Sequence, residues 1–236
     1  MLTMMIIKLI RCRWVCACYA VRHLGKTNLM NTHIPIMIDL GVTGFFSTDQ
    51  PIQLGAVCPS MVNDLTGPRS NLREAMFNRY IWQGKKISRE AQNVHGISGK
   101  RLWHLTMRGT HTFAHMFKEF ARWVSRIQKQ FKATSILFVS YRKISCKEML
   151  TKSLKINYMK MPREWIFWDS CESIKSILPY CCDLTLDGVY KSITGRKAPL
   201  DPKDALDNAL TIIPIWNFII LRTCLLSQKS PCLLYT

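Results

Sequence analysis

The sequence predicts one α/β domain built around a mixed β-sheet, and two observations support this prediction. Three short apolar segments follow one another between residues 34 and 81, which is typical of a meander of neighbouring strands. Beyond them, helix-like and strand-like segments alternate, which favours further strands with helices packed on the sheet. The chain has 236 residues, enough for one well-buried core, and its 48% apolar and 20% charged residues are typical of a globular protein.

The strand predictions depend on short runs of apolar and β-branched residues that are bounded by turn-forming residues. The five segments are IPIMIDL (34–40), PIQLGAV (51–57), FNRYI (77–81), ATSILFVS (133–140) and WIFWDS (165–170). The aromatic residues of the last segment, Trp165, Phe167 and Trp168, are interpreted as core rather than as a platform for stacking bases.

The helix predictions depend on N-cap residues and on apolar residues at the spacing of one helix face. The four predicted helices span residues 88–98, 111–131, 146–154 and 201–213. Ser88 is the expected N-cap of the first helix, and Asp201 with Pro202 opens the last. His111 and His115 have the i, i+4 spacing of a helical metal pair, but without a third ligand they are interpreted as part of a solvated helix.

The predicted domain spans residues 34–213. Residues 1–33 form an apolar, basic extension without any acid, which fits either an organellar presequence or a simple extension of the domain. Residues 214–236 form an apolar tail interrupted by Pro214, Asn217 and Arg222. A membrane helix needs about 20 uninterrupted apolar residues, so we expect no membrane span here but a surface tail or a helix packed on the domain.

The charge of the chain points to polyanionic partners. Thirty-three Lys and Arg against 15 Asp and Glu give a formal net charge of +18. Such an excess attracts nucleic acid first and anionic membranes second. A basic, solvated surface without a specific partner is the alternative.

The ten cysteines show no regular disulfide pattern. Reduced thiols in an intracellular protein, nuclear or cytoplasmic, are therefore expected. Cys12, Cys16 and Cys18 resemble half of a zinc site, but no second Cys/His pair at ligand spacing accompanies them.

Several strings, in the same order along the chain, resemble the DEDD-type 3'→5' exonuclease family over residues 34–213. The strings are IDLGVTG, PIQLGAV, FNRYIWQGKKISREAQNVHGISGKRL, FVSYRKISCKEML, EWIFWDSCESIK and LDGVYKSITGRKAPLDPKDAL. The resemblance is to the DEDDh-like members, with the patterns D-L-E-T-T-G, V-H-G-I-[ST] and H-x-A-x-x-D-A. It implies a ribonuclease-H-like exonuclease fold, in which helices flank a mixed central sheet.

The resemblance also implies an activity and a set of site residues. The family hydrolyses phosphodiesters with two divalent metals, Mg²⁺ or Mn²⁺, held by four carboxylates, and a His or Tyr helps to activate the water. Asp39 matches the first carboxylate and Asp204 the last. The remaining family positions are occupied by Gly41, Cys146 and Pro199, which supply no carboxylate and no base.

Because two of the five site residues remain, the sequence leaves it open whether the protein is an enzyme. It favours a nucleic-acid-binding pseudo-exonuclease that needs no cofactor. One alternative is an active exonuclease on DNA or RNA that uses Mg²⁺ or Mn²⁺ through Glu148 and Asp201 together with the two matching acids. The other is a non-enzymatic interaction domain with unknown protein partners.

Five residues are predicted to contact nucleic acid, with single strands as the expected partner. They are His95, Lys100, Arg101, Arg142 and Lys143. Basic residues beside a phosphate path raise non-specific affinity. The alternatives are that His95 is a helix-end residue held by local hydrogen bonds, and that the cations are scattered surface charges.

Overall fold

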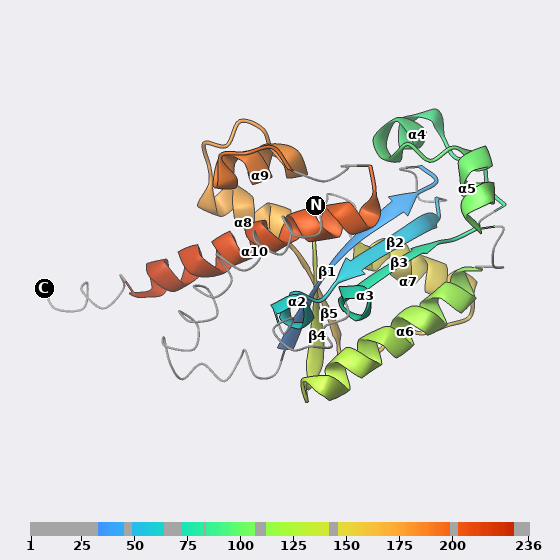
Figure 1. The fold of residues 1–236 in the computed structure, drawn as a ribbon, viewed down its shortest axis with the longest axis horizontal. Coiled ribbons are helices and arrows are strands. Elements are labelled where there is room, and N and C mark those ends of the chain that lie inside the picture. Colours follow the sequence, from blue (N-terminus) through green and yellow to red (C-terminus); the bar gives the residue numbers. More distant parts are fainter. Residues whose placement is uncertain are drawn as a thin grey trace, which may run out of the picture.

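The computed structural model describes residues 33–44, 49–63, 72–82, 84–106, 112–141, 146–198 and 203–228. A five-stranded sheet in the order β3-β2-β1-β4-β5 forms its centre (Figure 1). The strands are β1 (His33–Val42), β2 (Pro51–Val57), β3 (Met76–Tyr80), β4 (Ser135–Ser140) and β5 (Trp165–Asp169). β2 is antiparallel to β1 and β3, whereas β4 and β5 run parallel to β1. The predicted α/β class and mixed sheet are confirmed.

Helices cover both faces of this sheet. The described helices are α2 (Pro59–Asn63), α3 (Leu72–Ala75), α4 (Arg89–His95), α5 (Gly99–Thr106), α6 (Phe113–Gln130), α7 (Cys146–Ile156), α8 (Ser170–Ile177), α9 (Leu186–Thr194) and α10 (Ala205–Gln228). Figure 1 shows α6 and α10 on opposite sides of the strands. Along β1, Ile36 and Ile38 pack in the hydrophobic cluster that contains α6, and Met37 packs in the cluster that contains α10. Because side chains alternate along a strand, Asp39 is expected on the α10 side.

The predicted helix over residues 88–98 is shorter in the structure. Its N-cap is Ser88, as predicted, whose hydroxyl oxygen accepts a hydrogen bond from the amide of Ala91 at 3.1 Å. The helix ends at His95 because Gly96 adopts a left-handed conformation with φ of 65°. A separate helix, α5, then begins at Gly99, and the sequence analysis did not predict it.

The last helix is longer than predicted, because α10 continues past residue 213 and through Pro214. Proline removes one backbone donor from a helix, but the packing of Ile215, Trp216 and Ile219 in the core stabilises the continuation. The first part of the expected tail is thus a helix packed on the domain, one of the two alternatives. Its predicted opening residues, Asp201 and Pro202, lie outside the described residues.

Of the described helices, α10 has the length and apolar composition that could cross a membrane, over Ala205–Cys224. Within this stretch, 56% is buried inside the protein. The helix contacts β1, β2 and α9, as a core helix does.

The aromatic residues of β5 take part in packing. Trp165 is buried and contacts Phe117, Phe120 and Phe138. Phe167 stacks on Phe138, and Trp168 meets Trp216 of α10 edge to face. These contacts place the β5 aromatic residues in or against the core, as the sequence analysis predicted.

Candidate functional site

Asp39 lies near the end of β1, buried against the first turns of α10. The side-chain amide of Asn208 donates a hydrogen bond of 2.9 Å to Asp39 Oδ2. The helix comes this close because Gly55, which pairs with Asp39 across β1 and β2, has no side chain. A Cβ added at Gly55 would lie 2.2 Å from the backbone nitrogen of Leu206. Gly55 therefore sets the distance between the sheet and the helix that carries Asn208.

Asp204 directly precedes α10 and acts as its N-cap. Its Oδ1 accepts hydrogen bonds from the backbone amides of Leu206 at 2.8 Å and Asp207 at 3.3 Å. Its Oδ2 accepts from Gln53 Nε2 at 2.8 Å and from the hydroxyl of Tyr80 at 3.1 Å. Both carboxylate oxygens are thus used by donors of the protein.

Gln53 is the centre of this polar network, in the middle of β2 and fully buried. Besides its bond to Asp204, Nε2 donates to Asn78 Oδ1 at 3.0 Å. Its Oε1 accepts from the backbone amide of Ala205 at 3.3 Å. These contacts fix the orientation of the amide, with nitrogen toward Asp204 and oxygen toward the helix.

Tyr80, at the end of β3, keeps its proton. Burial, together with the negative charge of Asp204 and the hydrogen bond to it, raises the pKa of Tyr80 to about 12. At neutral pH the hydroxyl is therefore a donor to Asp204, and it is poorly suited to act as a base.

Two residues that stand where the similar exonuclease motifs have carboxylates, Gly41 and Cys146, have packing roles here. Gly41 pairs with Gln53 across β1 and β2, and a Cβ added at Gly41 would lie 3.3 Å from Gln53 Cβ. Cys146 begins α7 and is buried in the apolar cluster that also holds Ile38. Its thiol lies 4.0 Å from the carbonyl oxygen of Ile38. Glu148 is exposed in the first turn of α7. Pro199 lies outside the described residues.

The donor set around Asp39 and Asp204 does not fit a two-metal centre. Two hard cations need several anionic oxygen ligands, but the described side chains that donate hydrogen bonds to these carboxylates include the amides of Asn208 and Gln53 and the hydroxyl of Tyr80. For Gln53 to offer its oxygen to a cation, the amide would have to rotate and lose its bond from Ala205. Over the described ranges, no three His, Cys, Asp or Glu side chains gather where they could hold a metal ion.

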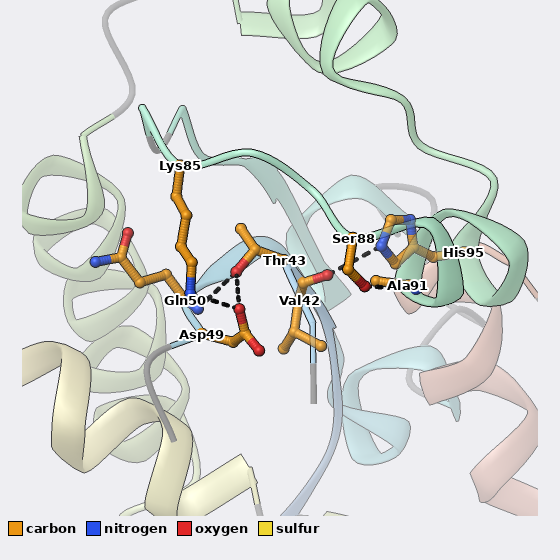
Figure 2. A network of polar contacts seen from close by, with 8 residues as sticks. All are labelled: Val42, Thr43, Asp49, Gln50, Lys85, Ser88, Ala91 and His95. Carbon is orange, nitrogen blue, oxygen red and sulfur yellow. Dashed lines mark hydrogen bonds and ion pairs between the residues drawn. The ribbon is translucent and has the colours of Figure 1, made fainter. Parts of the chain in front are cut away.

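His95 is the last residue of α4 and is buried, with its ring directed toward Val42 at the end of β1 (Figure 2). Its Nδ1 accepts a hydrogen bond from the amide of Ile97 at 3.1 Å, so the ring proton is on Nε2. Nε2 lies 3.0 Å from the carbonyl oxygen of Val42, to which it donates. The ring thus ties α4 to the end of β1. Its contact with nucleic acid stays a prediction.

A second buried acid, Asp49, was missed by the sequence analysis. Asp49 Oδ1 accepts from the hydroxyl of Thr43 at 2.9 Å and from Lys85 Nζ at 2.7 Å (Figure 2). The hydroxyl oxygen of Thr43 in turn accepts from the backbone amide of Gln50 at 3.0 Å. The network joins the end of β1 to the start of β2. The pair could not be predicted from the sequence, because Asp49 lies in a turn-forming segment and Lys85 lies 36 residues further along the chain.

The described cations of the predicted binding surface are on α5. Lys100 and Arg101 are exposed, and Arg101 Nη1 donates to the carbonyl oxygen of Gly96 at 3.2 Å. Trp103, on the same helix, is 48% exposed and meets the 39% exposed Trp82 edge to face, with 5.1 Å between ring centroids. This tryptophan pair was not predicted from the sequence.

Other predicted residues are not brought to this site or are not described. His115 is exposed and pairs with Glu119 at 3.5 Å on its own helix. Arg142, Lys143 and His111 lie outside the described residues, as do Cys12, Cys16 and Cys18.

No family model and no curated protein matches this sequence. Two of the similar solved structures are exonuclease X in complex with 5' overhanging duplex DNA and the RNase domain of the yeast Pop2 protein. Exonuclease X is 12% identical with a TM-score of 0.45, and the match covers 80% of this chain and 92% of that one. The Pop2 domain is 15% identical with a TM-score of 0.45, and the match covers 86% of this chain and 80% of that one.

Proposed function

We propose that this protein binds nucleic acid on an exonuclease-like fold and that its remaining carboxylates no longer support metal-dependent hydrolysis. The observation that carries the proposal is that Asp39 and Asp204 both accept hydrogen bonds from side-chain donors of the protein, Asn208 and Gln53. Amide donors stabilise a carboxylate without a cation. A metal ion would have to displace them and leave buried amide groups without their partners, which disfavours its binding.

The replaced family positions support the same proposal. Gly41 offers no side chain, and Cys146 offers a soft sulfur in an apolar cluster, a poor ligand for Mg²⁺. The hydroxyl of Tyr80, which donates a hydrogen bond to Asp204, keeps its proton at neutral pH. A missing general base alone typically lowers a rate about 10²–10⁴-fold.

Nucleic-acid binding is supported by charge and by exposed aromatic surface. The net charge of +18 favours a polyanion, and Lys100 and Trp103 are neighbours at i, i+3 on α5. Exposed aromatic rings beside cations bind single strands, because unpaired bases can stack on them. We therefore propose single-stranded DNA or RNA as the partner.

The experiment uses end-labelled single-stranded DNA and RNA of one sequence, incubated with the protein in Mg²⁺ and in Mn²⁺. Binding is followed by anisotropy and length by gel, beside an Asp39→Asn plus Asp204→Asn variant. The proposal predicts salt-dependent binding and full-length oligonucleotide with both proteins. Stepwise shortening by the wild type alone would establish the active exonuclease and direct attention to Glu148 and Asp201. A lack of salt-dependent binding would favour the non-enzymatic interaction domain.

A further inference from the structure

A basic groove lies along the free edge of the sheet, between β3 and α6. It has a volume of about 970 Å³ and extends from α3 over β3 to α6, with Leu206 of α10 at its border. Within the described part of the sheet, β3 pairs only with β2 and is an edge strand (Figure 1). The groove is therefore open along a strand whose outer edge no other described strand covers.

Five cations and one acid line this groove. They are Arg73, Arg79, Arg122, Arg126 and Lys129, with Glu119 as the acid among the described lining residues. Glu119 already pairs with Arg79 at 3.0 Å and with His115 at 3.5 Å. The groove thus has a strong positive excess, which favours an anionic partner with several charges.

Three of these cations follow one face of α6 at regular spacing. Arg122, Arg126 and Lys129 are at i, i+4 and i+7 and all are exposed. With a rise of about 1.5 Å per residue, they are spread over about 10 Å along the helix axis. Like charges at such spacing repel one another and destabilise a helix slightly. A linear polyanion that lies along the helix would relieve this repulsion.

The floor of the groove indicates which part of a nucleic acid it contacts. Phe77 and Trp123 line it, but both side chains are buried, and the indole of Trp123 donates to the carbonyl oxygen of Glu74 at 2.7 Å. No aromatic face of these two residues is available to stack on a base. Contacts are therefore with the phosphate backbone, which makes binding independent of sequence.

The groove also borders the polar network of the candidate site. Asn78 lines the groove, and its Oδ1 accepts from Gln53, which donates to Asp204 as well. Leu206, at the border of the groove, donates its backbone amide to Asp204. A chain bound along the groove would reach the edge of that network.

We propose that the groove between β3 and α6 binds the phosphate backbone of nucleic acid, with Arg122, Arg126 and Lys129 as phosphate contacts. This inference rests on the proposed nucleic-acid binding and adds to it a surface outside the residues predicted from the sequence. Because the groove contacts only the phosphate backbone of the nucleic acid, it binds both single strands and duplexes.

The test compares two triple variants of the full chain that lose equal charge. One is Arg122→Gln, Arg126→Gln and Lys129→Gln. The control is Lys155→Gln, Lys160→Gln and Arg163→Gln, three exposed cations at the end of α7 and before β5. Anisotropy of a labelled single strand and of a duplex is measured over a series of salt concentrations. Thermal unfolding verifies that both variants are folded.

The inference predicts a weaker salt dependence for the groove variant. Each phosphate contact contributes about 0.9 to the slope of log K against log salt for duplex DNA, so the slope should fall by about 2 to 3, and that of the control should stay near the wild type. If the groove variant is unstable, Arg126→Gln against Lys160→Gln should lower the slope by about 1. Equal slopes in groove variants and controls would overturn the inference.

Two further outcomes are informative. If the wild type binds none of the oligonucleotides, the proposed function itself is overturned. If the wild type binds and the groove variant binds equally well, only the groove assignment is overturned. A polyglutamate peptide that binds the wild type more tightly than the oligonucleotides, and loses binding in the groove variant, would assign the groove to an acidic peptide and overturn the inference.

Discussion

The side-chain amide of Asn208 donates a hydrogen bond of 2.9 Å to Oδ2 of Asp39, and so joins two buried residues 169 positions apart. Four residues before Asn208, Asp204 receives the equivalent bond from Gln53. The acids that resemble the first and last carboxylates of a nuclease site are therefore part of the internal polar network that fixes α10 on the sheet.

The bond between Asn208 and Asp39 should contribute to stability. Replacing Asn208 with Ala removes the donor and leaves a buried carboxylate without it, which should lower the free energy of unfolding by about 1–3 kcal/mol. Urea unfolding at neutral pH measures this, with Asn217→Ala on the same helix as the control. Equal losses in the two variants would show that the bond contributes nothing specific.

Close approach of α10 to the sheet should depend on Gly55. A Cβ there would lie 2.2 Å from the backbone nitrogen of Leu206, so Gly55→Ala must displace the start of the helix. We expect a loss of about 1–3 kcal/mol of stability. Gly84→Ala is the control, because no atom lies within 4 Å of a Cβ added at Gly84. A stable Gly55→Ala protein, similar to the control in thermal unfolding, would contradict this arrangement.

Alkaline pH should destabilise the protein partly through Tyr80. Its pKa is raised from 10.0 to about 12 in the folded protein, so the unfolded chain releases this proton first. The contribution to stability is complete below pH 10 and declines as the pH rises toward about 12. Between pH 10 and about 12, the free energy of unfolding of the Tyr80→Phe variant should fall less than that of the wild type. The difference between the two unfolding curves isolates Tyr80 from other groups, including Cys58, whose pKa burial raises to about 11.

Single-strand binding should require the exposed ring of Trp103. Stacking on an aromatic ring contributes about 1–3 kcal/mol per base, so Trp103→Ala should weaken single-strand binding at least about fivefold and duplex binding much less. Tyr180→Ala is the control, since Tyr180 is 93% exposed on the connection between α8 and α9. An equal loss for single strand and duplex would argue against stacking.

The sequence predicts the strands well and the helix ends less well, for physical reasons. Each strand is an apolar run between turn-forming residues, so local pattern suffices. The predicted end of the last helix, at residue 213, was wrong. Pro214 is a local helix breaker, and only the packing of Ile215 and Trp216 in the core shows why the helix continues. α5 was missed because its eight residues make only about two turns, too few for a clear helical period of apolar residues.

The candidate site was predictable only in part. Asp39 and Asp204 could be found from their surrounding motifs. Gln53 and Asn208 could not, because a buried amide has no sequence signature and its partner lies far along the chain. The groove on β3 was missed for a similar reason, since Arg79 and Arg126 come together only when the edge strand packs beside α6.

The most direct test of the central claim is calorimetric titration of the wild-type protein with Mn²⁺, beside the Asp39→Asn plus Asp204→Asn variant. Because amide and hydroxyl donors occupy these carboxylates, we expect no binding heat that distinguishes the two proteins. Stoichiometric Mn²⁺ binding by the wild type that the variant lacks would contradict the account, and would show that Asp39 and Asp204 still form a metal site.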